Sequence, residues 1–123
     1  MDVSKISKYL GYPTTVTNTY AKWVKSRNLG NATIYNFPIA ETGTAIAEIT
    51  FIPGEIADLV LLEIACIGSE LSGFEMELLK LGYTISAVHN HWVSKPQVFY
   101  IHCENLGEAD KLAKKISDLW DQL

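Results

Sequence analysis

The chain has 123 residues, of which 48% are hydrophobic and 20% are charged, and its net charge is −4. That length is enough for one hydrophobic core, so we expect residues 1–123 to form a single domain. An acidic chain without a run of lysines and arginines lacks the basic surface that nucleic acids bind, so no nucleic-acid partner is expected.

The N-terminal residues lack the basic and apolar segments of a signal peptide, and no apolar run is long enough to cross a membrane. Both cysteines, Cys66 and Cys103, lie in apolar strand patterns, which suits buried thiols in a reducing compartment. We therefore expect a cytoplasmic protein without a membrane partner.

Residues 1–40 are predicted to contain two short helices, because apolar residues recur there every three to four positions. The first helix would bury Val3, Ile6, Tyr9 and Leu10, and the second Val16, Tyr20, Trp23 and Val24. Residues 32–37 have the composition of a strand, which would end at Pro38.

Residues 42–123 predict two successive units, each with two strands and a helix. The strands are expected at residues 44–52, 59–67, 84–92 and 97–104, and the helices at residues 70–81 and 108–123. Ser69 is the expected N-cap of the first of these helices, and Gly82 follows its end. The expected fold class is α+β: an antiparallel sheet built from two ββα units, helices packed on one face, and short N-terminal helices.

All three histidines lie in the last predicted hairpin. Side chains alternate across a strand, so His89 and His91 should share a face. A two-residue or four-residue turn would pair Ala87 with His102 and bring His102 to that face, whereas a three-residue turn would send it to the other face.

The face opposite the histidines is the more apolar one and should pack on the helices. It would carry Val88, Trp92, Phe99, Ile101 and Cys103. The two units resemble each other, since Ile64-Ala65-Cys66 aligns with Ile101-His102-Cys103. If they are repeats, Glu48, Glu63 and Tyr100 lie on the open face beside the histidines.

Imidazoles with a nearby carboxylate are typical ligands of Zn, Fe, Mn or Ni. We therefore predict that His89, His91 and His102 hold a divalent transition metal ion. Tyr100, Glu48 and Glu63 are candidate ligand-binding or supporting residues. Two alternatives stay open: the histidines bind a small polar ligand without a metal, or they are partly buried polar residues that bond only to their neighbours.

The stretch from Gly82 to His91, with Pro96 to His102 and Gly107 to Ala113 after it, resembles the LppY/LpqO family, a bacterial domain of unknown function. The resemblance covers roughly residues 59–118, and Glu70 matches an acidic residue that opens the family's helix before the glycine. It implies that the three histidines are important but names no reaction.

Three functions are compatible with the sequence. The first is a cytoplasmic domain that binds a metal ion or a small polar ligand without catalysis. The second is a small metal-dependent hydrolase or lyase with Glu48 or Glu63 as general base. The third is an oligomerisation or protein-interaction module, for example a homodimer. The sequence does not decide whether the protein is an enzyme.

Overall fold

The computed structural model describes residues 1–43 and 45–123. For His91 it describes the backbone but not the side chain. The main sheet contains β1 (Thr15–Val16), β2 (Ala21–Ser26), β5 (Ile46–Ile52), β6 (Asp58–Ile67), β7 (Thr84–Trp92) and β8 (Val98–Gly107). A small separate hairpin contains β3 (Thr33–Ile34) and β4 (Phe37–Pro38). The helices are α1 (Val3–Leu10), α2 (Gly68–Lys80) and α3 (Ala109–Asp121).

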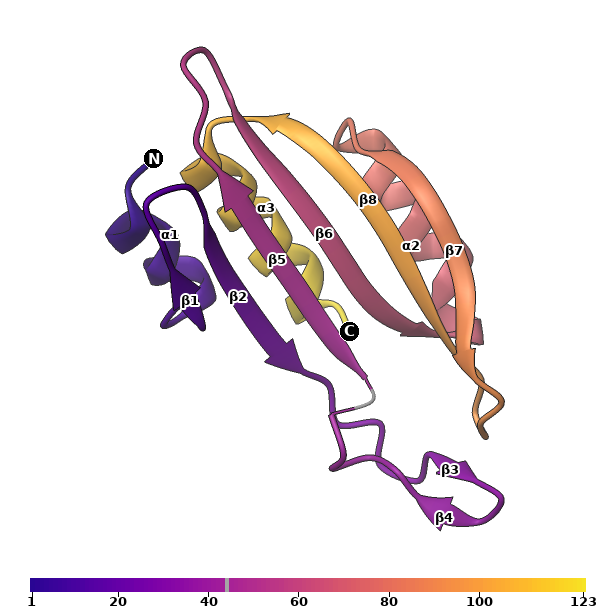
Figure 1. Cartoon of the computed structure of the whole chain (residues 1–123). Helices are drawn as coiled ribbons and strands as arrows, with labels where there is room; N and C mark the ends of the chain where they lie inside the picture. Colours follow the sequence, from indigo (N-terminus) through magenta and orange to yellow (C-terminus); the bar gives the residue numbers. More distant parts are fainter. Residues whose placement is uncertain (44) are drawn as a thin grey trace.

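The main sheet is antiparallel throughout its described ladders, with strand order β1-β2-β5-β6-β8-β7. All three labelled helices lie behind one face of the sheet, and the β3–β4 hairpin extends beyond its lower end (Figure 1). The predicted α+β fold class, with an antiparallel sheet and helices on one face, is therefore confirmed. No helix of the described chain is both long enough and apolar enough to span a membrane.

The core lies between the sheet and the helices. Along β5, Ala47, Ile49 and Phe51 are fully buried, while Glu48 and Thr50 between them face the other side. The predicted apolar stripes of α2 and α3 supply the opposing surface through Phe74, Leu78, Leu112, Ile116 and Leu119. Burial of each such side chain contributes about 1.5–3 kcal/mol to the free energy of folding. Because the helices cover only this face of the sheet, polar side chains can occupy the opposite face.

The second N-terminal helix predicted from Val16, Tyr20, Trp23 and Val24 is wrong. The structure forms β1 and β2 there, and β2 pairs with β5 along all six of its residues. Ala21 and Trp23 are buried with the period of two that a strand requires. Two interactions favour the strand: pairing with β5, and an edge-on contact of Trp23 with Phe51 at 5.8 Å between ring centroids. They outweigh the helix prediction, which rested on the spacing of only a few residues.

The strand predicted at residues 32–37 is a hairpin instead. Tyr35 and Asn36 have φ values of 49° and 67°, which reverse the chain between β3 and β4. Thr33 exchanges two backbone hydrogen bonds with Lys95, of 2.9 and 2.8 Å, so the hairpin is attached to the β7–β8 connection. Of the strand predicted at residues 44–52, Thr44 lies outside the described residues.

The start of α2 also differs from the prediction, whereas its end does not. Ile67, not Ser69, is the N-cap, and its backbone N–H donates to Glu70 Oε1 at 2.9 Å. Gly82 follows the helix with φ 88°, the left-handed conformation that terminates helices.

Candidate functional site

The β7–β8 hairpin has the register that brings two histidines together. Ala87 pairs with His102 and His89 pairs with Tyr100, so His89 and His102 are diagonal neighbours on the open face of the sheet. The register shifts once between Ile85 and Ala87 and again between Asn90 and Trp92. His89 lies in the part of β7 between these two shifts, where the pairing with β8 is regular.

The second shift corrects the placement of Trp92. The sequence placed this side chain on the helix-packed face, but Trp92 pairs with Val98 and so shares the face of Tyr100 and His102. An extra residue in one strand reverses the alternation beyond it. Trp92 is accordingly half exposed rather than part of the core.

The two imidazoles meet nitrogen to nitrogen. The Nε2 atoms of His89 and His102 are 2.8 Å apart, the ring centroids are 4.9 Å apart and the ring planes differ by 23°. His89 is exposed, and the side chain of His102 is 34% exposed. The pair is therefore open to solvent and to any ligand on this face.

Each ring also has an oxygen atom near its other nitrogen. His89 Nδ1 lies 3.2 Å from the carbonyl oxygen of Asn90, and His102 Nδ1 lies 3.9 Å from Glu63 Oε2. A carbonyl oxygen only accepts, so the contact of His89 favours a proton on its Nδ1, whereas the 3.9 Å between His102 Nδ1 and Glu63 is too long for a hydrogen bond and is an ion-pair distance. The 2.8 Å contact is a hydrogen bond when one ring carries its proton on Nε2, and two facing Nε2 lone pairs, the arrangement that suits a metal ion, when both rings carry it on Nδ1.

Tyr100 supports the His89 ring. Its side chain is buried, and its ring lies 6.1 Å from that of His89 with the planes 17° apart. Burial raises the pKa of Tyr100; a backbone hydrogen bond with Ile46 opposes this, and the charge of Glu63 adds to it. Tyr100 is thus a neutral, fixed platform at the base of the site.

Both predicted carboxylates lie on the histidine face, but their contacts differ. Glu48 is opposite Glu63, and Glu63 is opposite His102, so the three form one row across β5, β6 and β8. Glu48 forms an ion pair of 3.0 Å with Lys22, which raises the pKa of that lysine chiefly through its hydrogen bond. Glu63 is the carboxylate beside the histidine pair.

An open depression of about 480 Å³ adjoins His102 on this face. Its lining includes Lys22, Glu48, Thr50, Leu61, Glu63 and Glu104. Polar and apolar groups thus line a depression directly beside the His102 imidazole, as in sites for small polar ligands.

Among the side chains that the structure describes, which leave out those of Thr44 and His91, no three of histidine, cysteine, aspartate or glutamate gather closely enough to hold a metal ion. His89 and His102 supply two ligand nitrogens. The third predicted ligand, the side chain of His91, lies outside the described part, so its participation stays a prediction.

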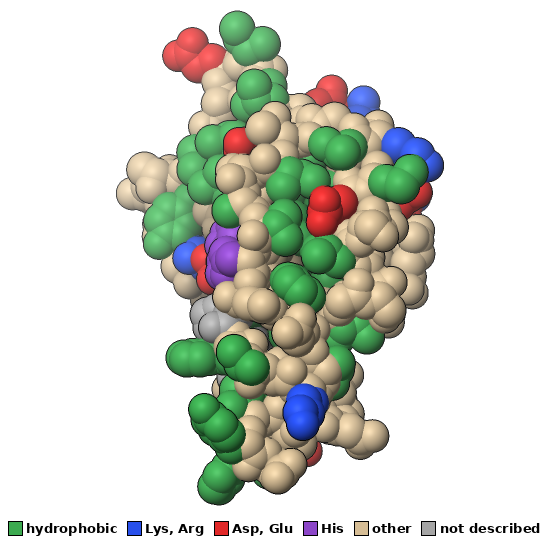
Figure 2. Space-filling model, turned by 90° about the vertical axis from the view of Figure 1, so that its right-hand side faces the viewer, with side chains coloured by type: hydrophobic (Ala, Val, Ile, Leu, Met, Phe, Trp, Pro, Cys, Tyr) green, Lys and Arg blue, Asp and Glu red, His purple; other side chains and the backbone are tan. Residues whose placement is uncertain are grey.

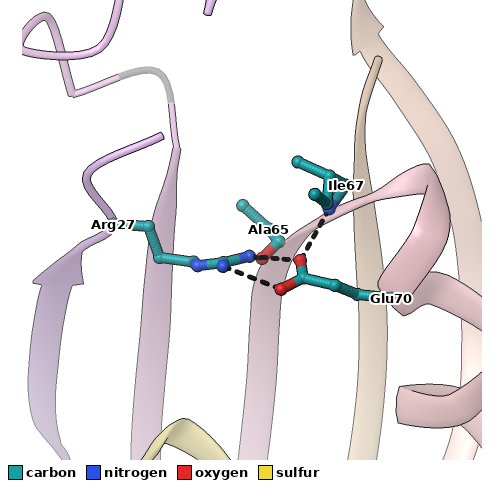
Figure 3. A network of polar contacts seen from close by, with 4 residues as sticks. All are labelled: Arg27, Ala65, Ile67 and Glu70. Carbon is teal, nitrogen blue, oxygen red and sulfur yellow. Dashed lines mark hydrogen bonds and ion pairs between the residues drawn. The ribbon is translucent and has the colours of Figure 1, made fainter. Parts of the chain in front are cut away.

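A partly buried ion pair that the sequence did not indicate joins the chain at the end of the sheet nearest this site (Figure 3). Arg27 donates to both carboxylate oxygens of Glu70, at 2.7 and 3.0 Å, and Nη1 also donates to the Ala65 carbonyl at 3.0 Å. Ala65 pairs with Tyr100 on β8, so the network positions the strand below the His89 ring. The position of Glu70, three residues after the N-cap, was visible in the sequence. Its pairing with Arg27, which is far away in the chain, was not predictable from it.

Electrostatics supports this network. Burial alone would raise the pKa of Glu70, but hydrogen bonds from Arg27 and from the Ile67 N–H outweigh burial and hold the pKa below its usual value of 4.5. Two parallel N–H···O bonds to a carboxylate are among the stronger side-chain interactions in proteins. Glu70 therefore stays ionised and joins the end of β6 to the start of α2.

The two cysteines are not part of the site. Both are buried on the core side, and burial raises the pKa of each thiol to about 12. A thiol with so high a pKa is a poor nucleophile and a poor metal ligand at neutral pH.

Comparison with known proteins identifies the family. A family model described as Domain of Unknown Function (DUF1259) matches residues 4–122, so the chain belongs to that family. The match includes the N-terminal third, which lay outside the resemblance seen in the sequence. No curated protein and no solved structure matches the chain.

Proposed function

We propose that the protein binds a divalent transition metal ion between Nε2 of His89 and Nε2 of His102. The observation that carries this is the 2.8 Å approach of the two nitrogens, with the Asn90 carbonyl 3.2 Å from Nδ1 of His89 and the Glu63 carboxylate 3.9 Å from Nδ1 of His102. A metal ion between the rings would replace the Nε2···Nε2 contact by two coordinate bonds, and Nδ1–H of His89 would keep the Asn90 carbonyl as its acceptor.

The geometry is close to what a metal needs. Two imidazole nitrogens at about 2.0–2.1 Å from one tetrahedral zinc ion lie about 3.3 Å apart. Both rings are at the surface, so small rotations of their side chains would reach this separation from the present 2.8 Å. The proposal includes His91 as a third ligand, with zinc, iron, manganese and nickel as the candidate ions.

Glu63 would orient His102 rather than act as a base. A carboxylate that accepts from the Nδ1–H of a ligating histidine sets the ring tautomer and makes the other nitrogen a better ligand. The contact of Glu63 with Nδ1 of His102 suits this role. The remaining coordination position would face the depression beside His102, where a small polar ligand would bind.

Two further expectations belong to this proposal. The likeness of residues 59–118 to the LppY/LpqO family supports a role for the same histidines. The free, buried cysteines suit a reducing cytoplasm.

The test is isothermal titration of tag-free protein with zinc sulfate, together with elemental analysis of protein purified without chelator. The wild type should bind one ion per chain, and His89→Ala or His102→Ala should abolish binding, because each removes one of two facing nitrogens. His91→Ala measures the contribution of the third histidine. Lys22→Ala, on the same face, is the control and should bind as the wild type does. Unchanged affinity in both His89→Ala and His102→Ala would refute the proposal.

A further inference from the structure

A second depression lies between the β3–β4 hairpin and the connection from β7 to β8, at the lower end of the molecule in Figure 1. Its volume is about 630 Å³, and none of its described lining residues belongs to the depression beside His102. Two backbone hydrogen bonds between Thr33 and Lys95, of 2.9 and 2.8 Å, join its two walls. Ser94, which is only 4% exposed, donates to the Pro96 carbonyl at 2.8 Å. These bonds give the depression a fixed shape before any ligand binds.

Tyr35 occupies a position in the hairpin turn that favours glycine. Its φ is 49° and that of Asn36 is 67°, so both residues have the left-handed conformation. Glycine adopts this conformation without strain and asparagine tolerates it, but a bulky aromatic residue rarely adopts it. The Tyr35 side chain is 93% exposed, so packing within the chain does not offset the strain. Strained residues cluster at binding sites, and Tyr35 lines the depression.

The charge of the depression differs from that of the chain as a whole. Lys95 is the charged residue among its described lining residues, which include no Asp or Glu, although the chain has 14 acidic residues. None of the ion pairs among the described residues includes Lys95. Asn36 and Gln97 also line the depression, and their side-chain amides are N–H donors. These polar groups together favour an anionic ligand.

The same depression has apolar walls. Tyr35, Val93 and Pro96 line it, and Val93 is 83% exposed. From the β7 side of the molecule, Figure 2 shows hydrophobic side chains together with a basic side chain at this lower end. An aromatic ring on a ligand would stack on the Tyr35 ring, and one ammonium group matches the single charge of a carboxylate. We infer that the depression binds a small aromatic carboxylate, with its ring against Tyr35 and its carboxylate beside Lys95.

This site is separate from the histidine pair, so the test uses the full chain in buffer with EDTA. Amide resonances are followed by NMR during titration with benzoate, 4-hydroxybenzoate and indole-3-acetate. At least one of these acids should give saturable shifts confined to residues 33–36 and 93–97. Benzamide has the ring without the charge and acetate has the charge without the ring, so each should bind about tenfold more weakly or less. Absence of saturable shifts in these residues with all three acids, or equal affinity for benzamide, would overturn the inference.

Two pairs of variants separate binding from folding. Lys95→Gln should weaken binding of the best acid about tenfold, whereas Lys115→Gln, at an exposed position on α3, should leave it unchanged. Tyr35→Gly should lose binding without a loss of stability in urea, because glycine adopts the left-handed conformation freely. Tyr12→Ala removes a tyrosine that is 97% exposed outside the depression and should bind as the wild type does. Wild-type affinity in both Lys95→Gln and Tyr35→Gly would contradict the assigned roles and the site.

Discussion

The two ββα units carry different chemistry on the open face of the sheet. In the unit β5-β6-α2, Glu48 and Glu63 occupy the central row, and Glu48 is neutralised by Lys22 from β2. In the unit β7-β8-α3, His89 and His102 lie on the same face and contact each other. The scaffold is shared, and we propose that a metal ion beside His89 and His102 takes the part in the second unit that Lys22 takes in the first.

The largest expected effect tests whether the two units contribute equally to the core. Ile64 and Ile101 are equivalent buried residues that pair across β6 and β8. Replacing either by Ala should lower the free energy of unfolding by about 2–5 kcal/mol, since each change leaves a cavity. Urea unfolding measures this. In the same experiment with EDTA, the double variant His89→Ala, His102→Ala should lose far less, and a loss as large as that of Ile64→Ala would make the histidines structural.

The next largest expected effect on stability concerns the ion pair between Arg27 and Glu70. Arg27→Ala should lower the free energy of unfolding by about 1–3 kcal/mol near neutral pH, because it leaves a half-buried carboxylate with fewer donors. The pKa of Glu70 is lower in the folded protein than its usual 4.5, so this contribution is present above that value and is lost as pH falls through the folded pKa.

Urea unfolding between pH 7 and pH 3 would follow this loss. The difference between wild type and Arg27→Ala should shrink toward pH 3. Lys114→Ala, which removes an exposed ion pair with Asp118, should leave stability nearly unchanged at every pH. A constant difference between wild type and Arg27→Ala across this range would argue that Arg27 acts through packing alone.

The two glutamates of the central row provide a sharper contrast in metal binding. Glu63→Gln should weaken zinc affinity about 10–100-fold, because it removes the carboxylate beside His102 Nδ1. Glu48→Gln, on the adjacent strand, should change affinity little. Affinity should also fall as the buffer is made acidic, because protons compete for imidazole nitrogen. Titration calorimetry decides, and equal effects of the two variants would assign Glu63 no special role.

The smallest effect concerns the charge balance of the first unit. Lys22→Ala should change the free energy of unfolding by less than about 1 kcal/mol, because exposed ion pairs contribute little. Chemical denaturation measures it. A clearly larger loss would show that the pair with Glu48 stabilises β2 on the sheet.

Much of the fold and part of the site follow from local patterns. The strands from β5 onward and the stripes of α2 and α3 have clear periodicity, so they were predictable. Strand alternation together with the expected repeat predicted Glu48, Glu63 and Tyr100 on the histidine face, where the structure has them. The N-terminal strands were not predictable, because β1 and β2 depend on pairing with each other and with β5 rather than on their own propensity.

The sequence by itself determined the fold class and the pairing of the last two strands as a hairpin, because these depend on periods of two and 3.6 residues. Only the tertiary structure decided the rest. The register shift near the end of β7 places Trp92 on the face opposite to the predicted one. Arg27 forms an ion pair with Glu70, which is distant in the chain. Glu48 pairs with Lys22, whereas Glu63 lies beside His102. Bulges and long-range ion pairs depend on how elements meet in space, and no local pattern of residues specifies that meeting.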